Sequence, residues 1–255
     1  MTLVSRPFAD HFSRVARAYA TYRPHYPDGL FAWLAGLPAR RELAWDCAAG
    51  SGQASVGLAA RFARVVATDA SAAQVSAAAP HPRIEYRVAP ADASGLESGT
   101  VDLVTIAQAL HWLDPGVFYA EASRVLAPGG AVAVWTYGVQ QVGIRTIDRL
   151  LQEFYTDIVG RYWAPERKLV DTGYRTLSFP FDELSPPRFR MEMEWTLADL
   201  LGYVGTWSAT EKFREVEGRD PVPTLGEAIA KHWGGTDRVR RVTWPLSVRA
   251  GYPRR

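Results

Sequence analysis

Short apolar runs alternate with helical stretches between residues 43 and 137 of the chain. The runs read "LAWDC", "RVVATD", "IEYRVA", "VDLVTIA" and "AVAVWTY". Such alternation predicts βαβ units around a parallel sheet, and nearly continuous apolar runs are typical of strands covered on both faces. Asp46 and Asp69 end the first two runs, and Asp92 follows the third within three residues. These acids are expected along the sheet edge where open α/β folds bind ligands.

Helix-capping residues mark where the intervening helices begin. Gly52 precedes "QASVGLAARFA", Ser71 precedes "AAQVSAAA", and Asp114 with Pro115 opens "PGVFYAEASRVLA". We expect the last of these helices to end at Pro128 and the two glycines after it.

The pattern changes after residue 137. A helical stretch near 143–160 leads into an aromatic, proline-containing region, and "RFRMEMEW" and "RVTWPLSV" have the alternation of strands. We predict an α/β, Rossmann-like, doubly wound and mostly parallel seven-stranded sheet, with a helical cap inserted after the fifth strand. The expected parts are lid helices over 1–40, a ligand-binding core over 41–140, cap segments at 141–187 and 196–238, and final strands at 188–195 and 239–250.

Composition limits the possible partners and compartments. The 255 residues are 47% hydrophobic and 22% charged, with a net charge of +2 and scattered basic residues, which argues against a nucleic-acid partner. There is no apolar run long enough for a membrane helix. The single cysteine, without CxxC or HExxH motifs, predicts no metal site and favours the cytoplasm. Phe8, Phe12, Val15 and Tyr19 fall on one helical face among several arginines, which leaves a mitochondrial transit peptide as an alternative. We expect a monomer or weak dimer.

The stretch "DCAAGSGQAS" (46–55) is a glycine-rich turn between a strand and a helix. Its small residues follow the spacing A-x-G-x-G, and Ser55 stands where a dinucleotide fingerprint has a third small residue. No Walker lysine follows. Asp69 comes 19 residues after Gly50, where a carboxylate can accept hydrogen bonds from ribose hydroxyls. The loop therefore predicts an adenosine-containing ligand and argues against NAD.

The ordered set "WDCAAGSGQ", "ATDAS", "APADAS", "AQALHW" and "EASRVLAPGGAVAVWTY" resembles the motifs of class I S-adenosylmethionine-dependent methyltransferases over residues 43–137. The family's loop usually reads Asp/Glu-x-Gly-x-Gly-x-Gly, and an alanine replaces its first glycine here. The resemblance implies S-adenosylmethionine as the cofactor. It assigns the ribose to Asp69, with Ala70 near the adenine, the adenine's polar edge to Asp92 and the Ala93 amide, and the methionine amino group to the chain around Gln108. The loop beside the methionine part would comprise Asp46, Ala48, Gly50, Gly52 and Gln53.

A closer resemblance reaches both ends of the chain. "ARAYATYRPHYPDGL", "YWAPERKLVDTGYRTLSFPF", "WTLADLLGYVGTWSA" and "WPLSVRAGY" are similar to segments of the trans-aconitate methyltransferase-like branch (methyltransferase type 11), whose members act on small organic acids and related molecules. In that branch the N-terminal segment folds over the cofactor, which makes Tyr19 and Arg23 candidate cofactor contacts. His25 is a candidate contact of a small-molecule methyl acceptor.

Methyl transfer requires an aligned nucleophile in a pocket that excludes water. A carboxylate acceptor needs hydrogen-bond donors to hold it but does not need a general base. A phenolic or quinone-like acceptor does need a general base. His111, just beyond the fourth strand, is the candidate catalytic residue, although a histidine there could also only shape its loop. Further candidate substrate contacts, for each of which core packing is the alternative, are Trp112, Tyr137, Tyr203, Trp207 and Ser208. Other possible functions are a non-catalytic S-adenosylmethionine-binding protein and a nicotinamide dehydrogenase.

Overall fold

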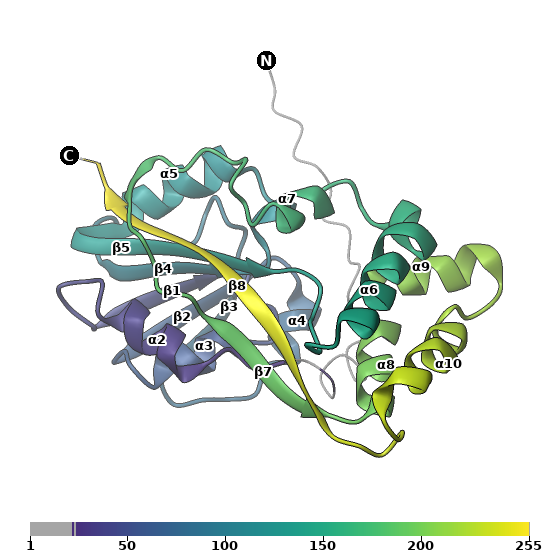
Figure 1. Cartoon of the computed structure of the whole chain (residues 1–255). Helices are drawn as coiled ribbons and strands as arrows, with labels where there is room; N and C mark the ends of the chain where they lie inside the picture. The colour runs from purple at the N-terminus through teal and green to yellow at the C-terminus, as the bar shows by residue number, and fades with distance from the viewer. Residues whose placement is uncertain (1–21, 23, 255) are drawn as a thin grey trace.

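The computed structural model describes residue 22 and residues 24–254. Its centre is an eight-stranded sheet in the order β3-β2-β1-β4-β5-β8-β6, with β7 paired to β8 (Figure 1). The first five strands run parallel, and β8 is antiparallel to its neighbours. This confirms the predicted α/β, mostly parallel architecture. The strands are β1 (Leu43–Cys47), β2 (Arg64–Asp69), β3 (Ile84–Val88), β4 (Val101–Ala107), β5 (Leu126–Tyr137), β6 (Phe181–Glu183), β7 (Arg190–Trp195) and β8 (Arg240–Pro253).

Helices cover the sheet on both faces, as the apolar runs require. The helices α2 (Asp28–Ala35) and α3 (Gln53–Ala59) lie on one face, and α5 (Pro115–Val125) and α7 (Arg167–Asp171) lie on the other (Figure 1). The short helix α4 (Ala72–Ser76) contacts β2 and β3. Alternate strand residues therefore belong to two hydrophobic clusters, with Ala44 in one and Trp45 in the other.

The predicted helix starts agree with the structure. The Ser71 hydroxyl accepts a hydrogen bond from the Gln74 amide, and Asp114 accepts from the Gly116 amide at 2.8 Å, with Pro115 in the first turn of α5. That helix ends at Val125, three residues before the proline, because the chain enters β5 at Leu126.

The strand count differs from the seven expected. The additional strand, β6, has only three residues and follows a proline, so it carries no alternation that could reveal it. The strand β7 also lies apart from the parallel core, since it pairs with the first part of β8 at residues 240–245. The second part of β8 pairs with β5 and β6. Residues 188–195 thus extend the sheet toward the cap instead of completing its core.

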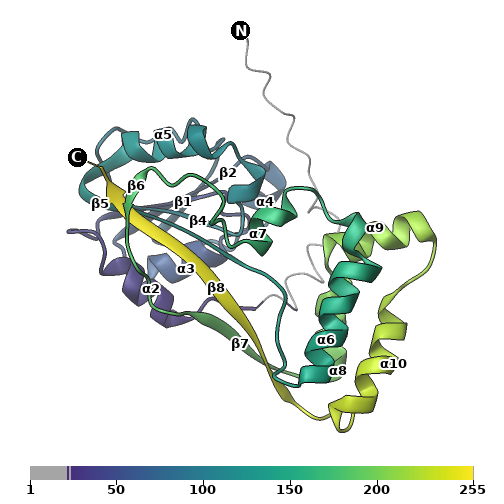
Figure 2. The ribbon, with the colours of Figure 1, turned by 45° about the horizontal axis from the view of Figure 1, so that its top comes forward.

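The cap is a group of helices at the end of the sheet to which β5 leads, and β7 and β8 connect to it (Figures 1 and 2). The helix α10 packs against both α6 and α8. In the described part of the chain, no helix is long and apolar enough to cross a membrane. The cap helices are α6 (Arg145–Glu153), the π-helical turn η2 (Phe154–Ile158), η3 (Gly160–Tyr162), α8 (Leu197–Gly205), α9 (Ser208–Glu217) and α10 (Val222–Trp233).

Candidate active site

The glycine loop lies at the carboxyl edge of the sheet, between β1 and α3. Gly50 and Gly52 have φ angles of 58° and 89°, in the region that favours glycine. The loop amides are used within the protein: Ala49 donates to the Thr68 carbonyl at 3.0 Å, and Gly50 donates to the Asp69 carboxylate at 2.8 Å. The Gly52 amide donates to the Ala49 carbonyl. These three N–H groups are therefore not directed outward as a phosphate cradle, which fits a ligand without a phosphate.

Asp69 ends β2 beside this loop. One carboxylate oxygen accepts from the Gly50 amide and the other from the Ser71 amide, each at 2.8 Å. A carboxylate has about four acceptor positions, so each oxygen retains one for a further donor. The residue is 9% exposed and Ala70 next to it is exposed. Asp69 can thus accept the two adjacent hydroxyls of a ribose, and the edge fits the adenosine part of S-adenosylmethionine.

Asp46 lies beneath the loop and is fully buried. Its carboxylate accepts hydrogen bonds from the Ser55 hydroxyl at 2.6 Å and the Thr105 hydroxyl at 2.9 Å, which join α3 and β4 to β1. Burial raises the pKa of Asp46 to about 6, against the lowering effect of these two bonds. The half-buried Ala48 above it has a φ angle of 52°, so the first glycine position of the family's pattern keeps its left-handed backbone. Asp46 therefore supports the loop from below.

Replacing Asp46 by asparagine is expected to change the pH dependence of stability. A carboxyl pKa raised from 3.8 to about 6 means that the wild-type protein loses stability from this group as pH rises through that range. Asparagine does not titrate. The free energy of unfolding of Asp46→Asn minus that of the wild type should increase by roughly 2 kcal/mol between about pH 4 and pH 7, at 1.36 kcal/mol per pKa unit. Denaturant unfolding at both pH values measures this difference. A difference that is the same at both would contradict the raised pKa.

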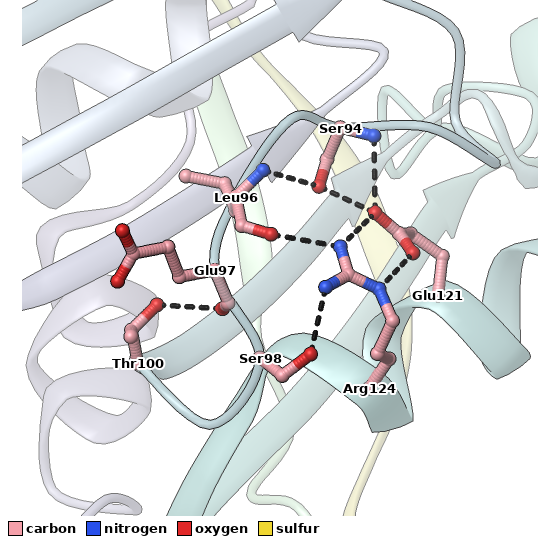
Figure 3. Close-up of polar contacts among 7 residues, drawn as sticks. All are labelled: Ser94, Leu96, Glu97, Ser98, Thr100, Glu121 and Arg124. Carbon is pink, nitrogen blue, oxygen red and sulfur yellow. Dashed lines mark hydrogen bonds and ion pairs between the residues drawn. The ribbon is translucent and has the colours of Figure 1, made fainter.

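The loop after β3 carries the candidate adenine contacts, and the buried carboxylate of Glu121, which pairs with a partly exposed arginine, holds it in place. Figure 3 shows the Glu121 carboxylate accepting from the backbone amide and hydroxyl of Ser94, at 3.0 and 2.6 Å, and pairing with Arg124. The hydrogen bond from Arg124 is the main cause that lowers the pKa of Glu121 to about 2. Asp92 and Ala93, immediately before Ser94, are exposed at the same edge as Asp69.

The segment after residue 21 connects the cap to the glycine loop. The Tyr22 ring packs so closely on α8 that a Cβ atom at Gly202 would lie 2.6 Å from it. The Gln53 side-chain nitrogen donates to the Pro24 carbonyl at 2.6 Å, and the side-chain oxygen of Gln53 is buried without a hydrogen-bond partner among the described residues. The Tyr26 ring contacts the Trp135 ring edge-on, with centroids 5.5 Å apart. Tyr19 and Arg23, the other candidate cofactor contacts of this region, lie outside the described residues.

Gln108 joins the carboxyl ends of β4 and β5. Its side-chain nitrogen donates to the Tyr137 carbonyl at 3.1 Å, and its side-chain oxygen accepts from the Tyr137 amide at 2.9 Å and the Thr136 hydroxyl at 2.6 Å. The φ angle of Gln108 is 56°. The side chain is thus engaged within the protein, which leaves the backbone around Gln108 for the predicted contact with the methionine amino group.

His111 lies in the 3-10 turn η1 (Leu110–Trp112), shortly after Gln108, and is 8% exposed. Its Nδ1 atom is 2.8 Å from the hydroxyl oxygen of Tyr174, a residue that is 1% exposed. Burial and, secondarily, the charge of Arg167 lower the pKa of His111 to about 3. The imidazole is therefore neutral at physiological pH. Trp112, whose ring centroid is 4.7 Å from that of His111, is 41% exposed and forms a wall beside it.

The remaining substrate candidates take different places. Tyr203 and Trp207 belong to the aromatic core of the cap, and the Tyr203 hydroxyl accepts a hydrogen bond from the Trp244 indole at 3.2 Å. Ser208 is exposed at the start of α9. Tyr137 is buried at the end of β5, with its ring 6.4 Å from that of Tyr26. The exposed His25 lines a surface hollow of about 500 Å³, whose lining contains none of the glycine-loop residues.

The structure adds functional candidates that the sequence analysis did not single out. Tyr174, in the turn after α7, bonds to His111, and Arg167 belongs to α7, which packs against η1. The charge of Arg167 lowers the pKa of His111. Gln140, in the loop after β5, is 2% exposed, and neither polar atom of its amide has a hydrogen-bond partner among the described residues. The glycine in "DTGYRT" signals a helix end, but only the tertiary fold brings that turn to His111. No cluster of metal-binding side chains occurs in residues 24–254.

The fold and this edge define a class of protein. Five parallel strands in the order 3-2-1-4-5 with an antiparallel neighbour, a glycine loop without a phosphate cradle, and an acid at the end of β2 are the features of class I S-adenosylmethionine-dependent methyltransferases.

Comparisons with known proteins agree with that class. A family model described as "Methyltransferase domain" matches residues 45–134. A Dictyostelium discoideum methyltransferase is 34% identical over 233 residues, covering 90% of this chain and 89% of the relative. An uncharacterized Mycobacterium tuberculosis methyltransferase is 33% identical over 199 residues, covering 77% and 74%. A solved structure described as a type II methyltransferase, from Anaeromyxobacter dehalogenans, is 45% identical with a TM-score of 0.86, covering 91% of this chain and 99% of that one.

The chain belongs to the S-adenosylmethionine-dependent methyltransferase family, and it is an enzyme that uses S-adenosylmethionine. When bound, this cofactor supplies a methyl group on a positively charged sulfur. The protein's own contribution is to bind, align and desolvate the two reactants.

Proposed function

We propose that this enzyme transfers the methyl group to a carboxylate of a small organic acid, in line with its resemblance to the trans-aconitate methyltransferase-like branch. The observation that carries this proposal is the position of Arg167 on α7, the helix that packs against the turn of His111, where its charge helps to keep that histidine neutral. The phenolic or quinone-like acceptor is the alternative.

Arg167 has the properties of a carboxylate-binding residue. Its guanidinium lies over the Trp163 ring at 4.5 Å and the Tyr155 ring at 5.3 Å, and its Nε atom donates to the Tyr155 hydroxyl at 2.8 Å. The carboxylate of Asp171 is 3.6 Å from the same Nε atom. Within the described chain, the two terminal amino groups make no hydrogen bond, and the side chain is 20% exposed. A fork of N–H donors is therefore available for a planar anion.

The low pKa of His111 supports a carboxylate acceptor over a phenolic one. A phenol, with an ordinary pKa of about 10, would have to give its proton to an imidazole whose pKa is about 3. That difference of roughly seven pKa units corresponds to about 10 kcal/mol, so His111 is a poor general base. A carboxylate is already ionised and needs no base. The combination of a cation and a neutral imidazole thus favours an acid.

The cofactor contacts follow from the edge described above and are part of the same proposal. Asp69 binds the ribose, Asp92 and the Ala93 amide meet the adenine, and the backbone near Gln108 holds the methionine amino group. The segment containing Pro24 covers the methionine end, supported by its bond to Gln53. His111 and Trp112 then line the acceptor side.

A panel of acceptors tests the proposal. The purified protein is incubated with S-adenosylmethionine and either small di- and tricarboxylic acids or phenols of similar size. Release of S-adenosylhomocysteine is followed, and methyl esters are detected by mass spectrometry. We expect ester formation with at least one acid and none of the phenols to react. Methylation of a phenol in the absence of any acid turnover would refute the carboxylate assignment.

A further inference from the structure

The hydrogen bond between His111 and Tyr174 determines which ring nitrogen of the histidine carries its proton. The two residues are 63 positions apart in the sequence, and both are buried. Since the imidazole is neutral, one of its nitrogens donates and the other accepts. The direction of the Tyr174 bond therefore decides what the second nitrogen, Nε2, offers to a ligand.

The surrounding bonds indicate that direction. The Gln108 amide is fixed by both the N–H and the C=O of Tyr137, so its oxygen must face the Thr136 hydroxyl, 2.6 Å away, and receive its proton. The Thr136 hydroxyl has only this one proton, so it has none left to give to the Tyr174 phenol. Tyr174 must place its own buried proton, and the imidazole nitrogen at 2.8 Å is a more basic acceptor than a hydroxyl oxygen.

We propose that Tyr174 is a positioning residue that donates to Nδ1 and so holds His111 as the Nε2–H tautomer. This inference rests on the proposed function, in which Arg167 binds the carboxylate: an Nε2–H group then gives that carboxylate a second donor. In ester formation one carboxylate oxygen attacks the methyl carbon, and the electron pair of the breaking carbon–sulfur bond stays on sulfur. No proton is transferred, so His111 keeps its tautomer throughout.

The turn that carries Tyr174 is held in an unfavourable conformation. Tyr174 has a φ angle of 60°, which an aromatic residue rarely adopts, and follows Gly173 at 62°. Arg249 fixes this turn from β8 by donating to the Tyr174 carbonyl at 2.9 Å and the Leu177 carbonyl at 2.8 Å. It also pairs with Glu183. Strained residues of this kind cluster at functional sites.

The same strain occurs at two other positions near this site. Among the described residues, the non-glycine residues with positive φ are Ala48 in the glycine loop, Gln108 just after β4, and Tyr174. Ala48 and Gln108 follow strands at the carboxyl edge of the sheet, and Tyr174 bonds to His111 at the same edge. The constrained turn therefore fixes the Tyr174 hydroxyl and gives its bond to His111 a defined geometry.

Nitrogen NMR tests the tautomer without a substrate. In protein labelled with ¹⁵N-histidine, long-range proton–nitrogen correlations distinguish a protonated ring nitrogen from an accepting one. We expect Nε2 of His111 to be the protonated atom, and we expect Tyr174→Phe to shift the signals toward a mixture of both tautomers. A wild-type spectrum with the proton on Nδ1, or signals unchanged in Tyr174→Phe, would overturn the proposal.

Kinetics with the accepted acid give a second readout. Tyr174→Phe should raise KM for the acid about tenfold, as expected for the loss of one well-placed hydrogen-bond donor, with a smaller change in kcat and unchanged S-adenosylmethionine affinity. Tyr119→Phe is the matched control, because Tyr119 is equally buried and its hydroxyl has no hydrogen-bond partner among the described residues. If no acid is methylated but Nε2 carries the proton, the acceptor assignment fails while the tautomer assignment stands.

Discussion

Asp69→Ala is expected to lower the affinity for S-adenosylmethionine by at least about a hundredfold. The variant would lose the two charge-assisted hydrogen bonds that we propose to the ribose, each worth roughly 1.5–3 kcal/mol, where 1.36 kcal/mol corresponds to a factor of ten. It also leaves the Gly50 and Ser71 amides without their acceptor, so the glycine loop loses its attachment to β2. Calorimetric titration with S-adenosylmethionine and S-adenosylhomocysteine measures the effect. NAD should not bind to the wild-type protein.

The control for this variant is Asp114→Ala. Asp114 also accepts hydrogen bonds from two backbone amides, those of Gly116 and Val117, but it does so at the start of α5. Its loss should cost about 1 kcal/mol of stability, the usual value of a helix cap, and leave cofactor affinity unchanged. Circular dichroism of both variants separates loss of binding from loss of fold. Wild-type affinity in a folded Asp69→Ala protein would contradict the assigned ribose contact.

The core of the fold was predictable because its information is local. The strands β1, β2 and β4 and the second part of β5 are nearly continuous apolar runs, and β3 alternates apolar and charged residues. Ser71 and Asp114 mark helix starts through bonds to residues two or three positions away. The strand β6 and the position of β7 were not predictable in this way. The three residues of β6 are too few to show an alternation. The position of β7 in the sheet depends on which half of β8 it pairs with, and tertiary contacts determine that pairing.

The candidate site likewise has one part that the sequence predicts and one part that it does not. Asp69 and the glycine loop could be identified because they follow strands whose carboxyl ends meet at one edge. The surroundings of His111 could not be identified in this way. Arg167 and Tyr174 belong to a helix and a turn that lie more than 50 positions further along the chain, and only the tertiary fold brings that segment to the turn of His111. Tyr203 and Trp207 stay predictions as acceptor contacts, because both lie in the cap's aromatic core while the partly exposed Trp207 also contacts the Tyr155 and Trp163 rings. Aromatic residues give the same sequence signal in either position.

Arg167→Met is expected to raise KM for the acid acceptor about a hundredfold, with little change in kcat or in cofactor affinity. Methionine keeps an extended side chain over Trp163 and Tyr155 but removes the charge that would pair with the carboxylate. Losing one partner of a desolvated, hydrogen-bonded charge pair costs roughly 2–5 kcal/mol. Arg167→Lys should recover only part of the loss, because lysine keeps the charge without the planar fork. Steady-state kinetics at saturating cofactor measure these changes.

A second measurement on the same variants locates the charge relative to His111. Since the Arg167 charge lowers the pKa of His111, that pKa should rise in Arg167→Met while staying below its ordinary value, because burial is the larger cause. Arg214→Met is the control. Arg214 is a cap arginine with a 30% exposed side chain that donates to the Gly205 carbonyl, and its loss should alter neither KM nor the histidine titration. An unchanged KM together with a raised His111 pKa would place Arg167 beside the histidine but outside the acceptor site, and the carboxylate proposal would then lose its cation.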